Sequence, residues 1–329
     1  MRLTGLDGLR AISILMVIAY HLDEGRFPHG EFGVNVFFVL SGFLITHLLC
    51  VEEERAGRIS ISSFYLRRAF RILPPAWTYL LAVIPLVGVG ATLPAVLFVA
   101  NFTGHNVSVG HYWTLSVEEQ FYLAWPTLFW ILRSNRNRLL LVAATLVVGF
   151  FWPDVVLKFG IPRRGLIATS LILLVGHYPI LIGCCLALAA RLRRLPRAAW
   201  WMPLLGLAWI LAGFTGRLPA SAATLLPFGV VPILHWAVSR HSLLDSPPLT
   251  WIGKVSYSLY LWQQLFCFKS PLAVLGRFPY NVLASFAMAA FSYYCIEQPA
   301  LRIRDRVAGG SVSRSKRNKS MVAAAAGRE

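Results

Sequence analysis

Residues 6–21 read LDGLRAISILMVIAYH, an apolar run that carries an aspartate and an arginine near its start and a histidine at its end. A run of this length and composition is typical of a helix that crosses a membrane. Comparable runs recur along the whole chain, so we expect an all-α, polytopic integral membrane protein with about ten transmembrane helices. These spans are predicted near residues 8–23, 32–51, 74–90, 113–132, 138–153, 168–190, 198–216, 221–239, 252–268 and 278–297.

The composition excludes a soluble globular domain. Of the 329 residues 57% are hydrophobic and only 14% are charged, whereas about a quarter of an ordinary soluble domain is charged. The net charge of +17 would suggest nucleic acid for a soluble protein, but in a membrane protein it reports loop orientation. With a cytoplasmic N-terminus, ten spans place most lysines and arginines on the cytoplasmic side. We therefore expect a multi-pass protein of the inner (plasma) membrane with both termini cytoplasmic and no nucleic-acid partner.

The chain is expected to form one membrane domain over residues 1–306. Residues 307–329 are rich in Gly, Ser, Ala, Lys and Arg, which predicts a disordered basic tail that is attracted to anionic lipids. The run over 166–190 contains a glycine, a histidine and a proline, and we count it as one crossing because a second crossing would remove the charge asymmetry. The five cysteines lie in or beside apolar segments and show no metal-binding spacing, so no metal is expected.

Arg10 and His21 are the most informative polar pair in the predicted spans. They are eleven residues apart, which on a helix is about 16.5 Å of rise and nearly three full turns. Both side chains therefore project from one face. Arg10 at the cytoplasmic edge can hold a phosphate, with Asp7 three residues before it, and His21 lies deeper, where an imidazole can act as a base. A snorkelling arginine and an interfacial histidine would also fit this pattern.

A second cluster of charge stands in YLRRAFRI, residues 65–72. We expect Arg67, Arg68 and Arg71 to project from a short amphipathic helix that Pro74 and Pro75 close at the membrane surface. Arg68 and Arg71 are spaced to form a clamp of two guanidinium groups, which suits the phosphates of a donor such as coenzyme A. An anchor for lipid head groups would use the same residues.

Residues 111–126 read HYWTLSVEEQFYLAWP and place two adjacent acids, Glu118 and Glu119, near the start of a span. Adjacent residues on a helix diverge by about 100°, so we expect only one of the two to face a given site. The pair could equally stabilise the N-terminus of the helix. Residues 33–46, GVNVFFVLSGFLIT, carry Gly33, Ser41 and Gly42, a small-residue face that lets helices approach closely.

Six strings in this order resemble the membrane-bound acyltransferase-3 family over nearly the whole chain. They are LDGLRAISILMVIAYH, GVNVFFVLSGFLIT, YLRRAFRI, HYWTLSVEEQFYLAWP, SYSLYLW and IEQPALR. The resemblance implies about ten transmembrane helices and transfer of an acyl group, often acetyl, from cytoplasmic acyl-CoA to a hydroxyl of a sugar or polysaccharide, free or lipid-linked. It places the family's Arg-x10-His pattern on Arg10 and His21, its Arg-x-x-Arg pattern on Arg68 and Arg71, and its inward-facing acid on Glu118.

Three positions depart from the family pattern. Thr114 stands in place of the usual serine and keeps the hydroxyl, Asn35 stands where aspartate is frequent, and Gln263 stands where many members have histidine. A glutamine side chain does not titrate, so we expect no acid–base chemistry at position 263.

The chemistry that the resemblance implies assigns a role to each candidate residue. We expect His21 to be the general base and Glu118 to orient its imidazole, while Arg10, Arg67, Arg68 and Arg71 bind acyl-CoA, with acetyl-CoA as the default donor. Ser116 is a candidate oxyanion donor, as are Ser41 and Tyr260. Direct transfer and an acyl-histidine intermediate both fit these residues.

Three other classes of function are compatible with charged residues in the membrane. A transporter or flippase of a lipid-linked glycan would line a pathway with them, although we see no internal repeat of the kind that such proteins carry. A membrane glycosyltransferase would use acids such as Asp23, Glu24 and Glu31, but would leave the arginine clamp unexplained. An inactive scaffold would tolerate replacement of Arg10 and His21.

Overall fold

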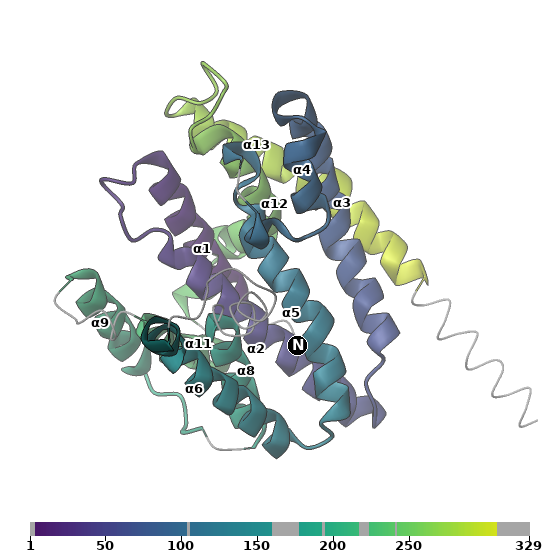
Figure 1. Cartoon of the computed structure of the whole chain (residues 1–329), viewed down its shortest axis with the longest axis vertical. Helices are drawn as coiled ribbons and strands as arrows, with labels where there is room; N and C mark the ends of the chain where they lie inside the picture. The colour runs from purple at the N-terminus through teal and green to yellow at the C-terminus, as the bar shows by residue number, and fades with distance from the viewer. Residues whose placement is uncertain are drawn as a thin grey trace, which may run out of the picture.

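A computed structural model describes residues 4–103, 106–159, 178–192, 195–216, 224–240 and 242–307, and every regular element in these ranges is a helix (Figure 1). The longer helices are α1 (Thr4–Leu22), α2 (Phe32–Ala56), α3 (Ile61–Val87), α5 (Tyr112–Ile131), α6 (Asn135–Phe159), α8 (Tyr178–Arg191), α9 (Met202–Phe214), α11 (Val230–Ser239), α12 (Pro247–Cys267) and α13 (Tyr280–Ser292). Short helices connect them: α4 (Val89–Val96), η1 (Ala100–Phe102), η2 (Val107–Val109), η3 (Leu226–Gly229), η4 (Leu243–Asp245) and the π-helix η5 (Tyr293–Glu297). The all-α prediction is confirmed for the described residues.

Length and composition make α1, α2 and α3 candidate membrane spans. Large apolar side chains also face outward in several places, among them Leu81, Leu123 and Leu283, which are 69%, 63% and 62% exposed. Such a surface suits contact with lipid rather than water. The count of ten crossings and the cytoplasmic termini stay predictions. The first part of the expected span over 168–190 lies outside the described residues. The expected tail over 307–329 also lies outside them, except for its first residue, Val307.

Helix α3 differs from the prediction. We expected a short amphipathic helix closed by Pro74 and Pro75, but one helix continues through both prolines to Val87. Each proline removes one backbone N–H donor from the helix, at the carbonyl oxygens of Phe70 and Arg71, and the helix continues in spite of this loss. Separately, two hydroxyl groups hydrogen-bond to other carbonyl oxygens in this part of the helix. Thr78 donates to the carbonyl oxygen of Pro74 at 2.8 Å, and Tyr257 donates to that of Ile72 at 3.0 Å. The arginines of α3 therefore share one continuous helix with an apolar segment.

Helix α2 also runs five residues beyond its predicted end, because the acids that follow its apolar part are paired. Each of three consecutive glutamates meets an arginine of a different helix: Glu52 with Arg67 of α3, Glu53 with Arg138 of α6, and Glu54 with Arg191 of α8. Arg138 is 1% exposed and binds both carboxylate oxygens of Glu53, at 2.6 and 2.8 Å. This end of α2 thus joins three neighbouring helices electrostatically.

Close approach of helices depends on glycine, as the small-residue face of residues 33–46 predicts. A Cβ atom on Gly42 of α2 would lie 1.8 Å from the carbonyl oxygen of Ile180 on α8, and one on Gly253 of α12 would lie 1.9 Å from that of Asp7 on α1. Neither gap admits a side chain. These contacts press α8 against α2 and α12 against α1, and so fix the helices that surround the polar interior.

Candidate active site

A polar pocket with a volume of about 90 Å³ lies between α1, α2, α3, α5 and α12. Its charged side chains are Arg10, Arg68, Arg71, Glu118 and Glu119. The remaining lining residues are Val34, Phe37, Phe38, Ser41, Ile72, Thr114, Leu115, Tyr122, Ser256, Tyr257 and Tyr260. The structure therefore brings three of the four arginines expected to bind a donor into one place.

A second, larger cavity of about 720 Å³ carries no titratable side chain. It lies between α1, α2, α9 and α11 and beside η4, and Ser242 is the polar exception in its apolar lining. An apolar wall can bind a hydrocarbon chain but offers no acid, base or phosphate clamp. The arginine pocket is therefore the candidate site for chemistry.

The three pocket arginines keep donors free for a ligand. The Nη1 atom of Arg10 lies 3.6 Å from Asp7, and that of Arg71 lies 3.9 Å from Glu297. Both separations are longer than a direct charged hydrogen bond, and a guanidinium has five N–H donors. The guanidinium of Arg68 lies 4.3 Å above the ring of Tyr122. The three guanidinium groups therefore retain N–H donors that could bind an anion, in a pocket that Glu118 and Glu119 also line.

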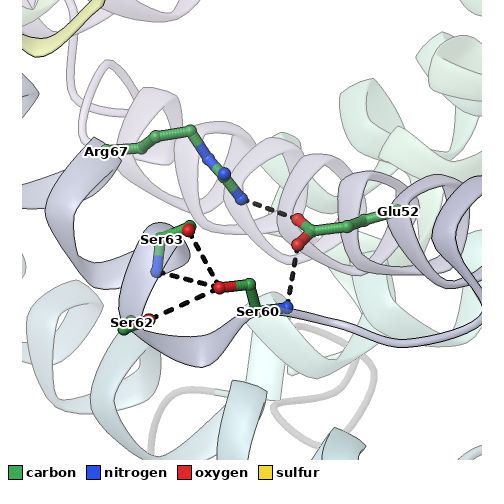
Figure 2. Close-up of polar contacts among 5 residues, drawn as sticks. All are labelled: Glu52, Ser60, Ser62, Ser63 and Arg67. Carbon is green, nitrogen blue, oxygen red and sulfur yellow. Dashed lines mark hydrogen bonds and ion pairs between the residues drawn. The ribbon is translucent and has the colours of Figure 1, made fainter. Parts of the chain in front are cut away.

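Arg67 lies apart from this group, although it is adjacent to Arg68 in sequence. Figure 2 shows its guanidinium paired with Glu52 at 2.7 Å, while the same carboxylate accepts the backbone N–H of Ser60 at 2.8 Å. Consecutive residues on a helix diverge by about 100°, which turns Arg67 away when Arg68 and Arg71 face inward. The structure therefore places Arg67 in an ion pair near the start of α3. It does not line the pocket in which we expected it to bind the acyl donor.

The expectation that only one of the adjacent acids faces a site is wrong, because both Glu118 and Glu119 line the pocket. The pocket wall is wide enough to contact both sides of this turn of α5. Glu118 accepts hydrogen bonds from Ser41 at 2.7 Å and from Tyr122 at 3.3 Å. These bonds hold Glu118 against α2 and its own helix, among the arginines, and its expected role of orienting His21 stays a prediction.

His21 stands at the other end of α1 and has a different partner. Its Nδ1 atom lies 2.6 Å from Oε1 of Gln263, and its ring packs 4.6 Å from the ring of Phe268. The side-chain N–H of Gln263 donates to the carbonyl oxygen of Tyr260 at 3.3 Å, which directs Oε1 at the histidine. Nδ1–H then donates to the amide, and Nε2 is left as the basic nitrogen. Gln263 positions the imidazole without itself exchanging a proton.

Ser116 does not line the pocket. Its hydroxyl donates to the carbonyl oxygen of Tyr112 at 2.8 Å and accepts the backbone N–H of Ala100 at 3.1 Å. These contacts fasten η1 to α5. The hydroxyl of Ser41 is likewise directed at Glu118. Two of the three candidate oxyanion donors, Ser116 and Ser41, thus have their single hydrogen committed within the protein.

Glu297 is a site residue that sequence reasoning did not single out. It lies in the π-helix η5 with no exposed surface, and π-helical turns often occur at functional sites. One carboxylate oxygen lies 3.9 Å from Arg71 and the other accepts a hydrogen bond from Ser258 at 3.4 Å. The string IEQPALR contains this glutamate, but only the tertiary structure reveals its arginine.

Comparisons with known proteins give one consistent result. Residues 3–297 match the acyltransferase-3 family, described as an acyltransferase domain. The chain is 30% identical to the peptidoglycan O-acetyltransferase OatA of Listeria monocytogenes, over 89% of this chain and 55% of that protein. It is 27% identical to the O-acetyltransferase OatA of Staphylococcus aureus, over 90% of this chain and 57% of that protein. The chain therefore spans little more than half the length of these relatives. No solved structure matches it.

Proposed function

The chain belongs to the acyltransferase-3 family, and from this premise we propose that it is a multi-pass enzyme of the plasma membrane. It transfers an acyl group, acetyl by default, from acyl-CoA on the cytoplasmic side to a hydroxyl of a polysaccharide on the other side. The relatives named as peptidoglycan O-acetyltransferases support a glycan as the acceptor. The observation that carries the proposal is the convergence of Arg10, Arg68 and Arg71 on one pocket, with His21 at the far end of α1.

The donor-binding part of the proposal rests on charge and reach. Acyl-CoA carries phosphates, which guanidinium groups recognise by paired hydrogen bonds. The pocket volume of about 90 Å³ accommodates only a part of such a molecule, so the remainder must extend from it. Arg10 and His21 are separated by about 16.5 Å of helix rise, a distance that the flexible arm of coenzyme A can cover. A donor held by its phosphates could then present its thioester to His21.

In the proposed reaction, Nε2 of His21 removes the proton of the acceptor hydroxyl. The hydroxyl oxygen bonds to the acyl carbon, the carbon–sulfur bond breaks, and the proton passes to the leaving sulfur. Gln263 holds Nδ1 of the imidazole so that the basic nitrogen faces the reactants. A general base of this kind contributes roughly 10²- to 10⁴-fold to a rate. A two-step route through an acyl-histidine would use the same residues and would leave label on His21 when the acceptor is absent.

The test is transfer of radiolabel from acetyl-CoA, added to inverted membrane vesicles, into the glycan fraction. Wild type is compared with His21→Ala, Arg68→Ala and the matched control Arg67→Ala at equal expression. We expect His21→Ala to abolish transfer and Arg68→Ala to raise the KM for acetyl-CoA. Arg67→Ala should behave like wild type, because its ion pair with Glu52 lies outside the pocket.

Three results would contradict the proposal. Wild-type vesicles that transfer no label to any envelope fraction would refute the donor or the acceptor. Normal transfer by His21→Ala would refute the base. A glycan that crosses the membrane without gaining label would favour the flippase.

A further inference from the structure

His111 is a buried histidine that the proposed reaction does not use. It immediately precedes α5 and is 4% exposed, yet neither ring nitrogen has a hydrogen-bond partner within the described part of the chain. Burying an unpaired polar group costs free energy, so such a group calls for an explanation. Trp262 supplies the other fully buried side-chain donor that lacks a partner there.

Aromatic packing holds the His111 ring in place. The ring centroids of Tyr79, Tyr112 and Tyr260 lie 5.1, 4.9 and 5.6 Å from that of His111, all in edge-to-face arrangements. The hydroxyls of Thr114 and Tyr260 both donate to the carbonyl oxygen of His111, at 2.8 and 3.4 Å. Backbone and ring are therefore fixed without use of either ring nitrogen.

Hydrogen bonds connect the backbone of His111 to both parts of the candidate site. Thr114 and Tyr260, which hold its backbone, line the arginine pocket. Toward the other part, the carbonyl oxygen of Tyr260 binds Gln263, which in turn binds His21. His111 itself does not line that pocket, so a thioester would have to extend beyond the pocket lining to reach this imidazole.

Acyl transfer needs a donor for the oxygen of the acyl carbonyl, which gains negative charge as the tetrahedral intermediate forms. Ser116 and Ser41 have their hydroxyl hydrogens committed elsewhere, and the hydroxyl of Tyr260 is engaged with Thr114 and the carbonyl of His111. An immobile, uncommitted N–H is the kind of group that this role requires.

We propose that His111 is a second catalytic histidine, whose ring N–H donates to the carbonyl oxygen of the transferred acyl group. This inference rests on the proposed function. The bond between the acceptor oxygen and the acyl carbon forms, the carbon–sulfur bond breaks, and the acceptor proton travels by way of His21 to the sulfur. His111 neither gains nor loses a proton; it stabilises the transient negative charge on the oxygen.

The test is His111→Phe, assayed for transfer from acetyl-CoA beside wild type and the control His47→Phe. Phenylalanine preserves the aromatic packing and removes both nitrogens. Loss of one oxyanion donor lowers kcat by roughly 10²- to 10³-fold, so we expect about a 100-fold loss with an unchanged KM for the donor. The thermal midpoint should stay equal or rise, because an unpaired polar group is replaced by an apolar one of similar shape. His47 is half-buried against Phe43 on α2, and its replacement should leave kcat unchanged.

The conservative variant His111→Gln separates catalysis from structure. Its amide N–H can donate to the same oxygen, so it should transfer at least about ten times faster than His111→Phe if the donor role holds. Wild-type rates in His111→Phe, or equal loss of rate and thermal stability in both variants, would overturn the role of His111 alone. A wild-type protein that transfers nothing would overturn both this inference and the proposed function.

Discussion

Replacement of Gln263 by leucine tests the proposed base through its partner. Gln263 Oε1 lies 2.6 Å from Nδ1 of His21, and its own amide N–H is held by the carbonyl oxygen of Tyr260 at 3.3 Å. Gln263 has no exposed surface, so water does not readily take its place. Leucine would leave Nδ1–H without a partner and would free the imidazole to adopt the other tautomer, in which Nε2 carries the proton and cannot act as a base.

The size of the effect follows from this geometry. Leaving a buried donor unsatisfied costs about 1–3 kcal/mol, and each 1.36 kcal/mol corresponds to a tenfold change in rate, so kcat should fall roughly 5- to 150-fold. The KM for acetyl-CoA should change little, because Gln263 does not line the arginine pocket. Gln263→Glu should retain more of the wild-type kcat than Gln263→Leu, since a carboxylate oxygen can still accept from Nδ1–H although it cannot donate to the carbonyl oxygen of Tyr260.

The assay is the initial rate of label transfer in vesicles, with protein amount and thermal midpoint measured in parallel. Gln120→Leu is the matched control. Gln120 makes hydrogen bonds to Asn101 and to the carbonyl oxygen of Phe98, at 2.9–3.2 Å, outside the pocket. Its loss should lower stability and leave kcat per folded molecule intact. A wild-type kcat in Gln263→Leu would refute the assignment of Nε2 of His21 as a base oriented by this amide.

Three further predictions concern the donor pocket and the packing of the helices. Arg71→Ala should raise the KM for acetyl-CoA at least tenfold in the vesicle assay, whereas Arg67→Ala should change it less than twofold, and equal effects would contradict the distinction between them. Glu53→Gln should lower the free energy of unfolding by about 1–3 kcal/mol, because the buried guanidinium of Arg138 loses its anion and keeps only neutral acceptors. A thermal midpoint in detergent within 2 °C of wild type, roughly the shift expected for 1 kcal/mol, would show that the pair is dispensable. Gly42→Ala should lower the yield of folded protein in size-exclusion chromatography, since its Cβ would lie 1.8 Å from a carbonyl oxygen of α8, and a normal elution profile would contradict that contact.

The sequence alone determined the helical fold class and most of the residues that the site uses. Apolar runs long enough to span a bilayer allow little else than helices, because backbone polar groups must be satisfied within the segment. Helical periodicity also grouped Arg68 with Arg71, and the small-residue pattern predicted the close contact at Gly42. These properties depend on residues near one another in the chain, so a single sequence contains them.

Contacts between distant segments were decided by the tertiary structure alone. Nothing in the local pattern shows that Gln263 meets His21 from 242 residues away, or that Glu297 approaches Arg71. The hydrogen bond between Ser41 and Glu118 is likewise absent from any local pattern, since the relative height and rotation of α2 and α5 fix which side chains meet. The sequence likewise does not show that the ring nitrogens of His111 lack a hydrogen-bond partner. That can be seen only once all neighbouring side chains of the folded protein are in place.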